Sequence, residues 1–302
     1  MSTAIQALKA LQYVFMLFFI GMTTFPAEMM DGYQMDFSCP KYKKGQPACD
    51  QQKNMAAIFG IMAIFGVQMG AFSVTMGAMA RDTVSKKAQS VACFMGMCSL
   101  LYFNVNDFIY TLSSDWPGTM PKEGVYFNMV LFAGLAALCY MGWTSTGSVT
   151  PNLSRMIPEG RFGKELLAGC LNLAFFGIPL VFFRSSFIDM YPAAAEPMKA
   201  LTPPLKWFSM WMFGNLGKMI LVNILTTFAI CSVEKNDDTQ YRLLRGSSLI
   251  YMFYLGSFSK DTIVQMLTGV DDTMRLMTFT QSFAVTYYQL NTWAGAKFTL
   301  TK

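Results

Sequence analysis

Apolar residues of this chain gather in long blocks that short polar segments separate. Each block is close to the roughly 20 residues that an α-helix needs to cross the hydrocarbon core of a bilayer. Charged residues, Pro and Gly mark the ends of the blocks. We therefore expect an all-α integral membrane protein with about eight transmembrane helices, at roughly residues 8–25, 55–80, 90–112, 125–145, 166–183, 207–232, 246–268 and 273–295.

Short motifs that recur in the same order predict an internal repeat. Asp107 recurs as Asp261, and a Phe-Gly pair and an Asp-Thr pair also recur, at offsets of 154 to 158 residues. Four helices return the chain to its starting side, so the two halves would share one orientation around an axis along the membrane normal. The prediction is a tandem repeat of four plus four helices, 1–150 and 151–302. Chance alignment of Phe- and Gly-rich helices is the alternative.

The distribution of basic residues indicates an orientation. Eight helices place both termini on one side, where twelve Lys and Arg residues border the helices, against nine on the other side. By the positive-inside rule, both termini would face the cytoplasm, matrix or stroma. The first block is interpreted as a membrane helix rather than a removable signal peptide, because no convincing cleavage site follows it. Whether the membrane is an organellar inner membrane, a thylakoid or the plasma membrane stays open.

The amino-acid composition limits the kinds of catalytic and ligand-binding site that the chain can form. Hydrophobic residues make up 53% of the chain and charged residues 14%, and there is no His, whereas an ordinary globular domain is about 25% charged. Without His, His-ligated haem or zinc and His acid–base catalysis are excluded. The net charge is +5. The basic residues lie at the ends of predicted helices, so attraction to anionic lipid headgroups explains them better than binding to nucleic acid. We expect no enzyme activity and no metal site.

Four charged residues lie well inside predicted spans, where burial is costly and usually marks function, and all but Lys260 are candidate site residues. The three candidates are Asp107, Lys218 and Asp261. At 1.5 Å per residue, Lys218 would lie about 16 Å deep, and Asp261 about 10 Å from the same surface. We predict an ion pair between Lys218 and Asp261 on adjacent antiparallel helices, with Asn215 and Asn223 as further partners.

Asp107 has no equivalent cation, because the position matching Lys218 in the first half is Ile64. Gln68, one helical turn further on, could hydrogen-bond Asp107 instead. Asn104 and Asn106 also lie near Asp107 in the sequence. A lone carboxyl group in such a place tends to be protonated, as a proton-coupled carrier would require. The structural alternative is that both Asp side chains reach headgroups or water and that Lys218 snorkels to the surface.

Small residues in the second block predict close helix packing. Gly66 and Gly70 form a Gly-x-x-x-Gly pair, and Gly60 and Gly77 extend the series. Such residues let helix backbones approach each other. A groove for a lipid or a pigment is the alternative.

Two of the seven cysteines lie outside the spans. Cys39 and Cys49 share the first loop and could close a disulfide if that side of the membrane is oxidising. The other five lie in or at the edges of spans, where a thiol behaves as a small apolar group.

Two functions from different classes fit this pattern. The first is a noncatalytic accessory or structural subunit of a larger membrane complex, such as an organellar energy-converting complex, in contact with lipids, other subunits and pigments. The second is a small-solute or ion/proton-coupled transporter or channel that uses Asp107, Asp261 and Lys218. A polar cavity on the repeat axis reached by these residues would favour the carrier, and a dry axis packed with Phe would favour the subunit.

Overall fold

The computed structural model describes residues 1–25, 50–113, 122–159, 162–190 and 203–246, with Met29, Trp116, Ala195, Met198, Lys199, Leu201 and Ser248; for residues 50–59 it describes the backbone only. The described residues form helices and contain no strand. The predicted spans 246–268, apart from its first residues, and 273–295 lie outside them. Asp261, Cys39 and Cys49 lie outside the described residues as well.

Six long helices make up the described structure. They are α1 (Thr3–Thr24), α3 (Asp50–Met79), α4 (Lys86–Leu112), α5 (Glu123–Ser145), α6 (Gly163–Phe182) and α9 (Pro203–Val233), with the short helices η1 (Leu153–Arg155) and α7 (Arg184–Asp189) between them. All six include a stretch long and apolar enough to cross a membrane. They confirm the first six predicted spans and the all-α class. The count of eight and the repeat stay predictions.

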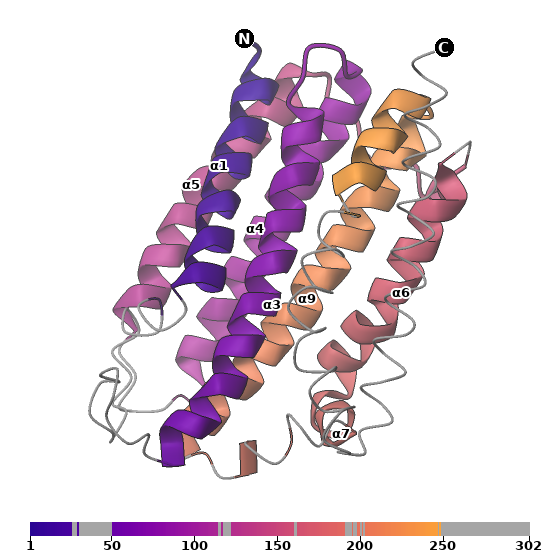
Figure 1. Ribbon diagram of the computed structural model, residues 1–302. Coiled ribbons are helices and arrows are strands. Elements are labelled where there is room, and N and C mark those ends of the chain that lie inside the picture. Colours follow the sequence, from indigo (N-terminus) through magenta and orange to yellow (C-terminus); the bar gives the residue numbers. More distant parts are fainter. Residues whose placement is uncertain are drawn as a thin grey trace.

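The helices alternate in direction, so their connections fall at two opposite ends (Figure 1). We call the end where α1 begins side A. The α3–α4 and α5–α6 connections and the last turn of α9 also lie at side A, and the opposite end is side B. Serine caps start two of the helices, because a hydroxyl can accept a hydrogen bond from a free backbone N–H of the first turn. Ser2 accepts from Ile5 N at 3.4 Å, and Ser85 accepts from Ala88 N at 3.2 Å.

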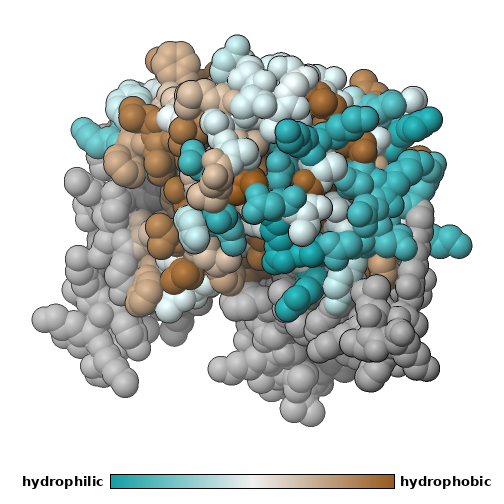
Figure 2. Space-filling view, turned by 90° about the horizontal axis from the view of Figure 1, so that it is seen from above, coloured by the Kyte–Doolittle hydropathy of each residue, from teal (hydrophilic) through white to brown (hydrophobic). Residues whose placement is uncertain are grey.

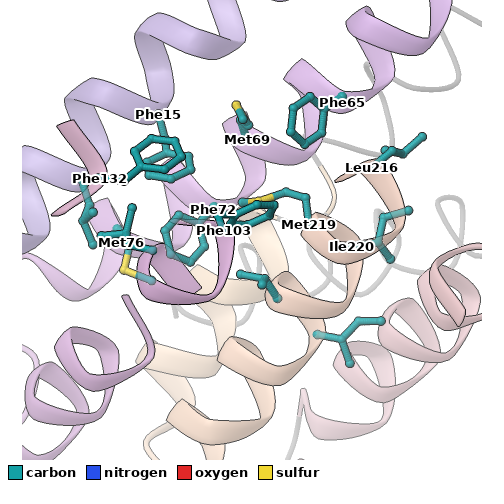
Figure 3. Packing of buried hydrophobic residues seen from close by; sticks show 14 of the residues in the cluster. Phe15, Phe65, Met69, Phe72, Met76, Phe103, Phe132, Leu216, Met219 and Ile220 are labelled. Carbon is teal, nitrogen blue, oxygen red and sulfur yellow. The ribbon is translucent and has the colours of Figure 1, made fainter. Parts of the chain in front are cut away.

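Two parallel helices, α3 and α9, form the centre of the bundle. They contact each other, α1 packs on α3, α5 packs on α4, and α6 packs on α9. The apolar stretches of α3 and α9 are each 72% buried, against 28% for α5. Phe and Met side chains fill the space between these helices, and Phe72, Phe103 and Met219 gather at the centre of the view in Figure 3. The centre of the bundle is therefore largely apolar.

Three of the four predicted packing glycines lie against α1. A Cβ atom on Gly66 would lie 2.8 Å from the Cβ of Met22, and Cβ atoms on Gly70 and Gly77 would lie within 3.0 Å of α1 side chains. Gly60 differs: it is exposed, and no heavy atom lies within 4 Å of the position its Cβ would take. The structure thus places Gly66, Gly70 and Gly77 at the α1–α3 contact, but it does not place Gly60 at a helix contact.

Polar residues cover part of the side A surface. In Figure 2, which views this end from above, hydrophilic residues gather on the side of α6 and α9. Lys235 forms an ion pair with Glu159, and Arg242 pairs with Asp238 at 2.7 Å. Gln240 donates a hydrogen bond to the Glu159 carbonyl at 2.6 Å. The two contacts of Glu159 connect the segment after α5 with the segment after α9.

Candidate functional site

The buried ammonium group of Lys218 lies between α4 and α9. Lys218 is 7% exposed, and its Nζ donates to Oδ1 of Asn106 on α4 and, at 3.5 Å, to Oδ1 of Asn215 on its own helix. The Nζ atom also lies 5.1 Å from the ring centroid of Tyr110, a cation–π distance. Two amide oxygens and an aromatic face therefore replace the water that this charge would bind outside the membrane.

Asp107 belongs to the same cluster. It is 7% exposed, and Asn106 donates through Nδ2 to its Oδ1 at 3.4 Å. The carboxylate and the Lys218 ammonium also attract each other electrostatically. The Asn106 amide thus accepts from Lys218 and donates to Asp107. We call Asn106, Asp107, Tyr110, Asn215 and Lys218 the polar cluster.

A second cation, Arg184, reaches the same helix from the start of α7. Its Nη1 donates to the Met210 carbonyl at 2.6 Å, and its Nε donates to the Leu180 carbonyl at 3.3 Å. The guanidinium lies against Gly214, where a Cβ would be 2.2 Å from Nη2. Arg184 and Lys218 repel each other electrostatically. Two cations, from α7 and α9, and one carboxylate, from α4, therefore lie near one another.

A small cavity opens beside the polar cluster. Its volume is about 40 Å³, and Asp107, Asn128 and Asn215 line it together with ten largely apolar residues, Phe15, Phe18, Met22, Met62, Phe65, Met69, Phe103, Phe132, Trp211 and Met212. Such a volume accommodates a few water molecules. Sites for small molecules usually measure about 300–1,000 Å³, so the cavity in this conformation does not hold a solute of that size.

Aromatic rings close the side B end of the polar cluster. The ring centroids of Trp116 and Trp207 lie 5.1 Å apart, those of Trp207 and Trp211 lie 6.2 Å apart, and Tyr110 lies 6.1 Å from Trp207. Lys122 lies over Trp116 at 5.8 Å from the ring centroid. This ring cluster was not predicted, because its members come from three separate segments and no local spacing connects them.

Gln68 and Asn223 form a polar contact of their own. The Asn223 Nδ2 donates to the backbone oxygen of Gln68 at 2.9 Å and to its Oε1 at 3.1 Å. The predicted partners are therefore corrected: the described contacts of Gln68 are with Asn223 rather than Asp107, and those of Asn223 are with Gln68 rather than Lys218. The physical reason is that α9 packs against both α3 and α4, whereas α3 and α4 touch each other little.

The other predicted contacts divide as follows. Asn215 does contact Lys218, as expected. The Lys218–Asp261 ion pair involves a residue outside the described part of the chain and stays a prediction. Across the described ranges, no group of three or more His, Cys, Asp or Glu side chains could hold a metal ion.

Comparison with known proteins identifies no relative. No protein-family model, no curated protein and no solved structure matches the chain. Function therefore has to be inferred from the geometry of this chain alone.

Proposed function

We propose that the chain is a noncatalytic accessory subunit of a larger membrane assembly, in contact with neighbouring subunits and with lipids or pigments. The observation that carries this proposal is the outer face of α5. Ala133, Gly134 and Ala137 are exposed there at helical spacing, and exposed Phe127 and Val130 flank them. Small residues on a membrane helix let a second helix approach its backbone closely.

The described part of the chain does not use this face for its own packing. Among the described residues, a Cβ on Gly134 would meet no heavy atom within 4 Å, whereas a Cβ on Gly142, which is buried about two turns further along α5, would lie 2.9 Å from the Cys93 Sγ atom. One face of α5 thus packs on α4 and α1, and the other is free of described contacts. Against lipid alone, large apolar side chains would serve this face equally well, so its small residues favour a helical partner.

The small cavities also support a subunit rather than a carrier. Both cavities described between the helices measure about 40 Å³. Phe and Met residues fill most of the space around α3 and α9. Neither cavity is large enough for a solute passage, and this favours a subunit over a carrier.

Purification in mild detergent tests this proposal. Gly134→Leu fills the outer face of α5 without a clash inside the chain, so it should abolish copurification of neighbouring subunits while the variant stays folded. Leu171→Phe is the matched control, since Leu171 is 61% exposed on α6, and it should keep the neighbours. The proposal fails if the wild type purifies without other polypeptides, or if both variants retain them equally.

A second candidate, a proton- or ion-coupled carrier, is supported by the polar cluster. Asp107 and Lys218 are buried charges next to a cavity, the arrangement expected of an intramembrane proton or ion site. Flux measured in liposomes would test it. Asp107→Asn, Asp261→Asn and Lys218→Met should each reduce proton-coupled flux of a carrier at least tenfold, and unchanged flux in all three rejects this candidate.

The orientation remains part of the proposal. The basic residues that border the helices support both termini on the cytoplasmic, matrix or stromal side. Single cysteines introduced at exposed side A positions should be labelled by a membrane-impermeant thiol reagent only after that side is opened. Labelling of these cysteines from the outer side of intact membranes would show that the orientation is the opposite of the one proposed.

A further inference from the structure

The contact between α3 and α9 joins corresponding helices of the two predicted repeats. Each is the second long helix of its half, and the two run in the same direction (Figure 1). Gln68 and Asn223, which hydrogen-bond across this contact, are 155 residues apart. The repeat pairs Gly60 with Gly214 at an offset of 154 residues, so Gln68 and Asn223 lie within one residue of corresponding positions. In a twofold interface, corresponding residues close to the axis meet each other.

The neighbouring helix pairs cross at matching positions. In the first half, a Cβ on Gly66 of α3 would lie 2.8 Å from Met22 of α1. In the second half, a Cβ on Gly177 of α6 would lie 2.6 Å from Ile220 of α9. The contacting residues are separated by 44 positions in the first pair and by 43 in the second. The α1–α3 and α6–α9 pairs thus share one register, although the glycine is on a different helix of each pair.

A second cavity borders the Gln68–Asn223 contact. It measures about 40 Å³, and its polar lining comes from Gln68, Thr75, Asn223 and Thr227. Asn223 is 8% exposed, and its Oδ1 has no hydrogen-bond partner within the described part of the chain. An acceptor left without a donor inside a membrane protein is costly, and no bulk water reaches it there. A polar cavity of this size has room for water that supplies the donor.

We propose that the two halves meet around a pseudo-twofold axis through Gln68 and Asn223, and that the adjacent cavity is a buried water site that completes this contact. The polar pair then specifies how α3 and α9 align, since an interhelical hydrogen bond in an apolar contact is satisfied in one register only. This inference concerns the inside of the bundle and is independent of the outer face of α5 on which the proposed function rests.

Exchanging the two residues in the full-length chain tests the axis. Gln68→Asn shortens one partner and Asn223→Gln lengthens the other, so each should lower the midpoint of thermal unfolding in detergent by about 1–6 °C. The double variant restores the total length and both amide groups, and it should recover at least half of the summed loss. Strictly additive losses would overturn the axial contact.

A buried amide away from the axis provides the matched control. Asn172 on α6 is 3% exposed and makes no described hydrogen bond through either side-chain polar atom. Gln68→Asn combined with Asn172→Gln should show additive losses, because the two residues share no contact. Equal recovery in this control would show that the recovery does not come from the axial pair.

A high-resolution density map of the full chain tests the water site. The wild type should show a peak at hydrogen-bond distance from Asn223 Oδ1, and Asn223→Leu should lack it. A cavity in the wild type that is empty, or that contains continuous acyl-chain density, would overturn the water site. Neither result would bear on copurification through α5, so failure here is distinguishable from failure of the proposed function.

Discussion

Two glycines on the same helix should respond in opposite ways to one added methyl group. Gly142 of α5 lies where α5, α4 and α1 meet. A Cβ there would be 2.9 Å from Cys93 Sγ and 3.1 Å from the Cα of Ala4. Apolar carbon atoms normally lie about 3.5–4.0 Å apart, so Gly142→Ala requires the backbone of α1 to move by roughly half an ångström.

The size of the effect follows from the cost of overpacking. Forcing an extra methyl into a packed core costs about 1–3 kcal/mol. For a domain of 150–250 residues, each kcal/mol corresponds to about 2–4 °C in the unfolding midpoint. Gly142→Ala should therefore lower the midpoint by about 2–12 °C. The higher helix propensity of Ala offsets up to about 1 kcal/mol of this cost. We therefore expect a fall of the unfolding midpoint in the lower half of this range of about 2–12 °C.

Gly134→Ala is the internal control for this measurement. It has the same chemistry on the same helix, but its Cβ meets no heavy atom within 4 Å. The substitution changes only the helix propensity of this position, in which Ala exceeds Gly. The midpoint of thermal unfolding should therefore stay within about 2 °C of the wild type or rise. Thermal unfolding of both variants in one detergent, followed by circular dichroism, gives the comparison. Equal shifts in the two variants would refute the described packing of α5 on α1 and α4.

The remaining predictions concern charges. Lys218→Met leaves Asn106 Oδ1 without its charged donor and Asp107 without the nearby cation. It should cost about 1–3 kcal/mol of unfolding free energy, and adding Asp107→Asn should recover part of that loss; a double variant as unstable as the single one would contradict this electrostatic coupling. On side A, the hydrogen bond and charge of Lys235 hold the pKa of Glu159 below its ordinary value of 4.5. The contribution of this pair is therefore complete above pH 4.5 and is lost as the pH falls through the lower pKa of the folded state. Acid titration of unfolding midpoints should show this loss in the wild type and not in Lys235→Gln.

The membrane-spanning helices could be predicted because the length and polarity of each apolar block are properties of one continuous stretch of sequence. Six predicted blocks match six helices, and the start of α1 was missed by five residues because Ser2 caps the helix early. The spacing of Gly66 and Gly70 was sufficient to predict a helix contact, since residues four apart share one helix face. Nothing in the spacing indicates that Gly60, on the same helix, is exposed instead.

The partners of the buried polar residues could not be predicted in the same way. Depth along a helix placed Lys218 near the middle of the membrane, but depth does not say which helix faces it. Its amide partner Asn106 is 112 residues away in the chain. Arg184 was expected in a loop, and its long side chain instead folds back onto the Gly214 backbone. Flexible stems of this kind separate the position of a charge from the position of its Cα atom.

If the halves are related as the predicted repeat has it, the residues that differ between them mark the part of the molecule that only one half contains. Gly214 accommodates Arg184, and Lys218 lies one turn further along α9. The positions of α3 that correspond to these two residues are Gly60, which is exposed, and Ile64, which carries no charge. A path for ions built symmetrically around the axis would need the same cations in both halves. The cations instead belong to α9 and α7 among the described residues, whereas the neutral Gln68–Asn223 pair joins the halves. The arrangement therefore favours one charged cluster that holds α4 against α9 over a pair of equivalent transport sites, and this is what a structural subunit requires.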